Sequence, residues 1–196
     1  MRLLEHDPDE HALLIERCVP GTPLAEAGQD MALDVFVDLL PRLWKPAGAP
    51  FHTLADEAAR WAEYLPGQDW SMSPEILDAA LEALRELPST QGELVLVNQD
   101  LHADNVLAAQ REPWLVIDPK PLVGEREFGI APIVRSFELG HSRRDVLYRF
   151  DRLTSELGLD RERARGWTIA QTAAWTWDSD YSARHVEAAR WLLEGG

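Results

Sequence analysis

Residues 94–128 read LVLVNQDLHADNVLAAQREPWLVIDPKPLVGEREF, and this stretch decides the fold. The apolar run at 94–97 predicts a buried strand, and the polar segment 98–105 predicts a loop. Two short apolar runs, 106–109 and 114–117, flank a polar turn and predict a hairpin. Because the strand ends face one loop, we expect Asp100, Asn105 and Asp118 to meet in one cleft.

These three side chains have the chemistry that phosphoryl transfer from ATP requires. One carboxylate takes the proton of the acceptor hydroxyl, while an amide oxygen and a second carboxylate hold Mg²⁺ against the nucleotide phosphates. The spacing matches the D-x-x-x-x-N loop and later metal-binding Asp of protein kinases. An Asp and an Asn five positions apart also occur by chance, and in that interpretation they only hydrogen-bond the loop.

Helical patterns surround this segment on both sides. Pro41 falls near the end of the first helix, and Thr53 and Asp160 are candidate N-caps. The expected helices span 31–44, 53–65, 73–87, 128–139, 143–157, 160–177 and 182–194. The fold class that follows is α+β and mostly helical, with few strands clustered around one polar loop.

The N-terminal part of the chain contributes one more apolar run. Residues 11–18, HALLIERC, predict a buried strand that ends at the turn signal PGTP, 20–23. Cys18 is the only cysteine, so a disulfide within the chain and thiolate-rich metal sites are excluded.

The net charge of −15 restricts the partners. Such a field repels phosphate backbones and anionic lipid, so we expect no nucleic acid and no membrane surface as partner. It attracts a cationic ligand, although acidity is also a common means of solubility. No apolar run exceeds four residues, which predicts neither a signal peptide nor a membrane helix and favours the cytoplasm.

The segment 94–128 resembles the catalytic segment of the aminoglycoside phosphotransferases, which have a protein-kinase-like fold. Within that family it is similar to the branch of streptomycin 6-kinases and hydroxyurea phosphotransferases. Their loop usually reads like HGDLHxxNVL and their metal strand like VIDPKG. Residues 13–24, LLIERCVPGTPL, resemble the family's hinge, which is similar to LLLERLxPGxxL.

The resemblance implies a role for each matching residue. Asp100 would be the catalytic base, and Asn105 and Asp118 would bind Mg²⁺. The backbone of Glu16, Arg17 and Cys18 would border the adenine of ATP. The implied reaction moves the γ-phosphate of ATP to a hydroxyl of an aminoglycoside-like molecule.

Further acidic residues are candidates for a cationic or polar small-molecule acceptor. Asp104 lies in the loop, where it and His102 support the loop or line the acceptor side. Asp178 and Asp180 lie between two expected helices, in the region from which the family builds its acceptor pocket. A solvated turn is the other interpretation of that pair. We expect His185 on an exposed helix surface.

The chain departs from the family pattern at several positions. Asn98 replaces a His that braces the loop, Pro121 replaces a Gly, and Gly129 replaces an Asp that anchors the loop. A buried loop amide left without its partner costs about 1–3 kcal/mol. Lys120, in the metal strand, is expected either near a phosphate or paired with a surface acid.

The resemblance also divides the chain. Residues 1–24 would form the hinge strand and turn, 25–92 helices, 93–120 the catalytic loop and metal strand, and 121–196 the C-terminal helices. This is one kinase-like C-terminal lobe, and the N-terminal nucleotide lobe is absent from the sequence. We therefore expect weak Mg·ATP binding and little turnover.

Three other interpretations stay open at this point. The chain could be a catalytically silent ligand-binding or interaction module, with a second copy or a partner covering its upper face. It could be a fragment from an incomplete gene start. The cluster 100–104 could belong to a zinc or iron hydrolase, although no second His pair at helical spacing supports it.

Overall fold

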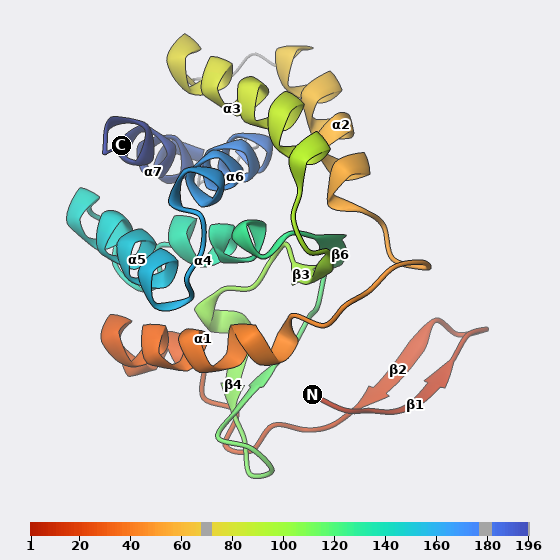
Figure 1. Ribbon diagram of the computed structural model, residues 1–196. Coiled ribbons are helices and arrows are strands. Elements are labelled where there is room, and N and C mark those ends of the chain that lie inside the picture. Colours follow the sequence, from red (N-terminus) through yellow and green to blue (C-terminus); the bar gives the residue numbers. More distant parts are fainter. Residues whose placement is uncertain (68–71, 177–181, 196) are drawn as a thin grey trace.

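The computed structural model describes residues 1–67, 72–176 and 182–195 (Figure 1). The strands are β1 (Leu3–Asp7), β2 (Ala12–Ile15), β3 (Val95–Asn98), β4 (Val106–Ala108), β5 (Trp114–Val116) and β6 (Pro121–Gly124). The α-helices are α1 (Gln29–Leu43), α2 (Leu54–Tyr64), α3 (Pro74–Glu86), α4 (Ala131–Arg135), α5 (Arg143–Glu156), α6 (Arg161–Ala174) and α7 (Ser182–Glu194). Short 3-10 helices are η1 (Leu24–Ala27), η2 (Leu65–Gly67), η3 (Leu87–Thr90), η4 (Ala103–Asn105) and η5 (Arg126–Ile130).

The mostly helical α+β prediction is confirmed. Helix α6 lies at the centre of the helical body, where it packs against α3, α4 and α7 (Figure 1). Its buried side includes Trp167, which meets Phe128 edge to face at 5.8 Å between ring centroids. The strands pair as three antiparallel two-stranded sheets, β1–β2, β3–β6 and β4–β5.

The helix ends follow the expected capping chemistry. The Thr53 hydroxyl accepts a hydrogen bond from the backbone of Asp56 at 3.0 Å, and Asp160 caps α6 in the same way. Pro41 lies in the last turn of α1 and does not break it. These predicted helices are therefore confirmed, since local sequence signals set their ends.

Strand β6 was not expected from the sequence. It pairs with β3 in the register Leu96–Val123, and it carries the chain from the catalytic segment to the core. A Cβ at Gly124 would lie 2.6 Å from the Leu54 Cβ, so only glycine allows β6 to approach α2 this closely. A four-residue strand that begins with proline gives too weak a pattern to predict.

The prediction of a buried strand at 11–18 is wrong. The strand is shorter, Ala12–Ile15, and pairs with β1 in a hairpin that stands apart from the helices (Figure 1). Leu13 is 67% exposed and Leu14 57% exposed. An apolar run is buried only where a second surface packs on it, and the described residues provide none.

The predicted helix at 128–139 is also wrong in extent. Helix α4 ends at Arg135, because Ser136 has extended backbone angles. The segment after it is held by Arg149, whose fully buried guanidinium donates to the carbonyls of Val134, Ser136, Leu139 and Gly140. A side chain fifteen residues away from Val134 thus takes the carbonyls that a longer helix would have used.

Among the described helices, none combines the length and the apolar character that crossing a membrane requires.

Removing the Arg149 guanidinium should destabilise the fold strongly. In Arg149→Met, the four carbonyls and the Gln29 side chain lose their donor, and we expect a loss of about 3–5 kcal/mol in the free energy of unfolding. Urea denaturation followed by circular dichroism measures this. Arg60→Met, at an exposed ion pair with Glu57, should cost under about 0.5 kcal/mol, and equal losses in the two variants would contradict the assignment.

Candidate active site

The candidate catalytic loop begins at Asn98, whose side chain accepts two hydrogen bonds. Its side-chain oxygen accepts from the backbone of Asp100 at 3.0 Å and of Lys120 at 3.1 Å. The backbone of Gln99 also donates to the Lys120 carbonyl at 3.1 Å. The amide of Asn98 therefore braces the loop, in the place where the resemblance suggested a bracing His.

Asn105 closes the other side of the loop. Its side-chain nitrogen donates to the Asp100 carbonyl at 2.9 Å, and its own carbonyl accepts from Ile117 at 2.9 Å. Asp118 follows directly, with a left-handed φ of 44° and a carboxylate that is 64% exposed. The three residues that were expected to converge, Asp100, Asn105 and Asp118, thus lie on adjoining backbone segments.

Two cations flank the carboxylate of Asp100, which is only 14% exposed. Lys120 forms an ion pair with Oδ2, and its Nζ also lies 3.9 Å from Oδ2 of Asp118. Arg135 lies on the other side, with Nη2 3.7 Å from Oδ1. Both cations also face the ring of Trp175. Lys120 therefore pairs with Asp100, the candidate base, and also lies near Asp118, the candidate metal ligand.

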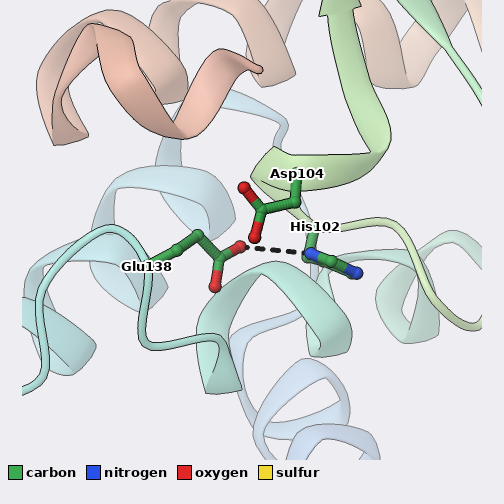
Figure 2. Close-up of side chains that lie close together, drawn as sticks. All are labelled: His102, Asp104 and Glu138. Atoms are coloured by element: carbon green, nitrogen blue, oxygen red, sulfur yellow. Dashed lines mark ion pairs between the residues drawn. The ribbon is translucent and has the colours of Figure 1, made fainter.

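A second brace joins the loop to the segment after α4. Glu138 Oε1 accepts from the backbone of Ala103 at 2.9 Å and lies 3.4 Å from Nδ1 of His102 (Figure 2). Burial raises the pKa of Glu138, but the bonds from His102 and the backbone amides outweigh it and lower the pKa to about 2. Burial lowers the pKa of His102, and Glu138 outweighs this to raise it.

Asp104 lies beside this pair, and the ligand atoms of His102, Asp104 and Glu138 all lie within 4.8 Å of one another (Figure 2). Such a set has the donor types of a metal site. Glu138 Oε1 already faces both His102 and the Ala103 amide, so hydrogen bonding accounts for its position. The cluster therefore holds the loop in place, and it brings Asp104 to the rim of the site.

Two cavities lie near the loop and share Trp175 as a wall, and Asp100 lines the smaller one. The larger, of about 730 Å³, lies between α2 and the end of α6, and Lys120 and Gln99 line its floor. The smaller, of about 420 Å³, is lined by Asp100 and by the brace residues. A molecule of moderate size can therefore reach the carboxylate of Asp100.

The predicted hinge residues lie against the hairpin β4–β5. The carboxylate of Glu16 accepts two hydrogen bonds from Arg111, at 2.7 and 2.8 Å, and these lower the pKa of Glu16 to about 2. Cys18 is half-buried. The turn that follows is fixed by Gly21, whose φ is 82° and whose Cβ position would lie 3.0 Å from the Cys18 carbonyl oxygen.

Comparison with known proteins adds an independent finding. Residues 1–180 match the model of the family described as aminoglycoside/hydroxyurea antibiotic resistance kinase. The chain belongs to the aminoglycoside/hydroxyurea antibiotic resistance kinase family.

Characterised members of this kinase family are similar over most of the chain. A streptomycin 6-kinase of Streptomyces griseus is 41% identical over 190 residues, which cover 91% of this chain and 62% of that protein. A hydroxyurea phosphotransferase of Kitasatospora aureofaciens is 38% identical, covering 98% of this chain and 60% of that protein. The chain thus spans about three fifths of the length of these relatives.

Solved structures share the fold. Choline kinase from Streptococcus pneumoniae superposes with a TM-score of 0.69 at 13% identity, covering 98% of this chain and 74% of that one. The aminoglycoside phosphotransferase APH(4)-Ia gives a TM-score of 0.58 at 19% identity, covering 90% and 69%. The kinase-like fold is therefore established by structure as well as by sequence.

The kinase family's usual anchor Asp is replaced here by Gly129, and the structure shows how the chain manages without it. A Cβ at Gly129 would lie 3.0 Å from Nε1 of Trp44, so a longer side chain there would require the Trp44 ring to shift. The loop amides of Asp100 and Ala103 are satisfied instead by Asn98 and Glu138. The expected cost of an unpaired amide is therefore avoided at these two positions.

Sequence reasoning missed some residues of this candidate site and left others open. Glu138 and Arg135 come from a segment that was expected to be one continuous helix. The expectation that His185 lies on an exposed surface is wrong, since it is 7% exposed and contacts Arg135. Lys120 is paired with Asp100 rather than with a remote surface acid. Asp178 and Asp180 lie outside the described residues.

The His102–Glu138 brace should weaken as the pH rises. His102 gains its partner on folding, so its stabilisation is complete below its ordinary pKa of 6.5 and is lost as the pH passes its raised pKa. Glu138 contributes above its ordinary pKa of 4.5, and this is lost as the pH falls toward about 2. A double-mutant cycle of His102→Gln and Glu138→Gln should give a coupling of about 1–2 kcal/mol at pH 6. A coupling that stays constant up to pH 9 would contradict this.

Proposed function

We propose that this chain carries the catalytic loop of a cytoplasmic kinase that transfers the γ-phosphate of ATP to a hydroxyl of an aminoglycoside-like small molecule. The observation that carries the proposal is the convergence of Asp100, Asn105 and Asp118 across one hydrogen-bonded junction. Family membership and relatives named streptomycin 6-kinase support the same reaction.

Asp100 is the base in this proposal. Its carboxylate lies at the wall of the smaller cavity, where an acceptor hydroxyl can reach it. It takes the hydroxyl proton as the acceptor oxygen bonds to the γ-phosphorus and the bond to the ADP oxygen breaks. Lys120, which pairs with Asp100 in this structure, is long enough and exposed enough to turn toward a phosphate.

The donor atoms at the junction suit Mg²⁺. Asn105 uses its side-chain nitrogen on the Asp100 carbonyl, which leaves the amide oxygen as a ligand, and Asp118 presents an exposed carboxylate. Both are hard oxygen ligands, and two protein ligands suffice because phosphate oxygens and water complete the coordination. When bound, Mg²⁺ neutralises charge on the nucleotide phosphates. The backbone of Glu16, Arg17 and Cys18 would border the adenine.

A cationic or polar acceptor fits the two cavities. The larger has aromatic walls, with the acidic Glu57 and Glu63 beside the cations Arg60 and Lys120. The smaller adds Asp104 and Glu138. Aromatic faces and carboxylates together suit a ring that carries cationic groups. Related folds are known with such ligands, since APH(4)-Ia has been solved with ADP and hygromycin B. Asp178 and Asp180 remain candidates for the same acceptor.

Binding of Mg·ATP should depend on Asp118. We expect Asp118→Asn to weaken Mg·ATP binding at least about tenfold, because a charged ligand of the cation is lost. Isothermal titration with and without Mg²⁺ measures this. The control is Asp78→Asn on α3, an exposed position that lines neither cavity. Equal affinities for all three proteins would contradict the metal assignment.

Turnover should depend on Asp100. With streptomycin and hydroxyurea as acceptors, release of ADP should fall about 10²–10⁴-fold in Asp100→Asn, while Mg·ATP affinity changes little. The loss arises because an amide cannot take the hydroxyl proton. The unmodified chain is expected to turn over slowly, and if Asp100→Asn retains that activity in full, the proposed function is wrong for this chain.

A further inference from the structure

Arg135, the last residue of α4, is a buried cation directed at the candidate base. It is 7% exposed, and its Nη2 lies 3.7 Å from Oδ1 of Asp100. Its Nη1 lies 3.1 Å from Nε2 of His185, and its guanidinium stacks 4.7 Å from the centroid of the Trp175 ring. Residues of α4, of the C-terminal end of α6 and of α7 therefore direct the guanidinium of Arg135 at the carboxylate of Asp100.

A comparison with Arg149 indicates that Arg135 does more than stabilise the fold. Arg149 is also buried, and its guanidinium makes five hydrogen bonds to four carbonyls and one side chain. Among the described residues the guanidinium of Arg135 has one hydrogen-bond partner, His185, and the Nε atoms of both arginines are buried without a partner. Burial lowers the pKa of Arg135 to about 10, so it remains charged at neutral pH. Burying a charge is costly, and Arg135 is a buried charge that lies beside Asp100 with N–H donors not used in hydrogen bonds.

His185 fixes the direction of this guanidinium without neutralising it. Burial, together with the charge of Arg135, lowers the pKa of His185 to about 4, so the imidazole is neutral. Arginine can only donate, so Nε2 of His185 must accept and the ring proton must lie on Nδ1. The imidazole therefore supports one end of the guanidinium while the other end faces Asp100.

We propose that Arg135 is the positioning residue that makes the two oxygens of Asp100 inequivalent. The buried Arg135 holds Oδ1 in place. Lys120, which is 44% exposed, pairs with Oδ2 and leaves when the acceptor arrives, so that Oδ2 takes the hydroxyl proton. Contacts of this kind are often long without substrate and shorten in the reactive complex. This inference rests on the proposed function, in which Asp100 is the base.

The first test separates turnover from binding. In Arg135→Gln, the release of ADP with streptomycin and Mg·ATP should show a kcat about 10–100-fold lower, with both KM values within about twofold, because a misplaced base slows only the chemical step. Arg135→Lys should restore part of the loss. A kcat that is unchanged in Arg135→Gln, or a loss that appears only in KM, would overturn the proposal.

A second readout does not need turnover. The carboxyl carbon resonance of Asp100, assigned by its absence in Asp100→Asn, should be single and narrow in the unmodified chain. In Arg135→Gln it should shift and broaden at fixed pH, since the carboxylate is no longer held. The control is Arg163→Gln, which removes a half-buried guanidinium that bonds Glu125 and the Leu87 carbonyl and not the loop. An unchanged Asp100 resonance in Arg135→Gln would refute the positioning role, even if no acceptor is phosphorylated and the proposed function fails.

Discussion

The geometry of the site depends on one amide oxygen. Asn98 ends β3, and its Oδ1 accepts from the backbone of both Asp100 and Lys120, which belong to segments twenty residues apart. These two hydrogen bonds connect the start of the candidate catalytic loop to the turn after Asp118. Two strong backbone donors demand an acceptor at that point, so the orientation of the amide is determined. The Asn98 amide acts together with the bond from Gln99 to the Lys120 carbonyl and the bond from Asn105 to the Asp100 carbonyl, which join the same segments.

The helical body supplies the second half of the site by ending a helix early. Because Arg149 takes the carbonyls after α4, the chain leaves the helix at Ser136 and brings Glu138 back to the Ala103 amide. The same early end leaves Arg135 in the last turn, beside Asp100. The buried guanidinium of Arg149 in α5 thus positions both Glu138 and Arg135 beside the loop. Packing outside the loop therefore determines which side chains surround Asp100.

The sequence predicts those parts of the molecule that local patterns control. Thr53 and Asp160 cap helices whose apolar faces repeat at helical spacing, and the loop residues Asp100, Asn105 and Asp118 follow from spacing next to apolar strands. Glu138 and Arg135 were missed because they contact loop residues 35 positions earlier in the chain. His185 was misplaced because it is buried against Arg135, 50 positions away, and no local pattern encodes such contacts. The hairpin β1–β2 was misjudged for a related reason, since an apolar run predicts burial without saying what covers it.

The charges near Asp100 resolve an apparent conflict in this acidic chain. A net charge of −15 favours a cationic acceptor and opposes the phosphates of ATP. The carboxylates of Glu57, Glu63 and Glu138 lie on the cavity walls. The structure places cations beside these carboxylates, since Lys120 lines the larger cavity and Arg135 the smaller one. Lys120 and Arg135 stand at the carboxylate of Asp100, where they offset its charge and that of its neighbours. A phosphoryl group that approaches the base therefore meets two cations locally, although the protein as a whole repels it.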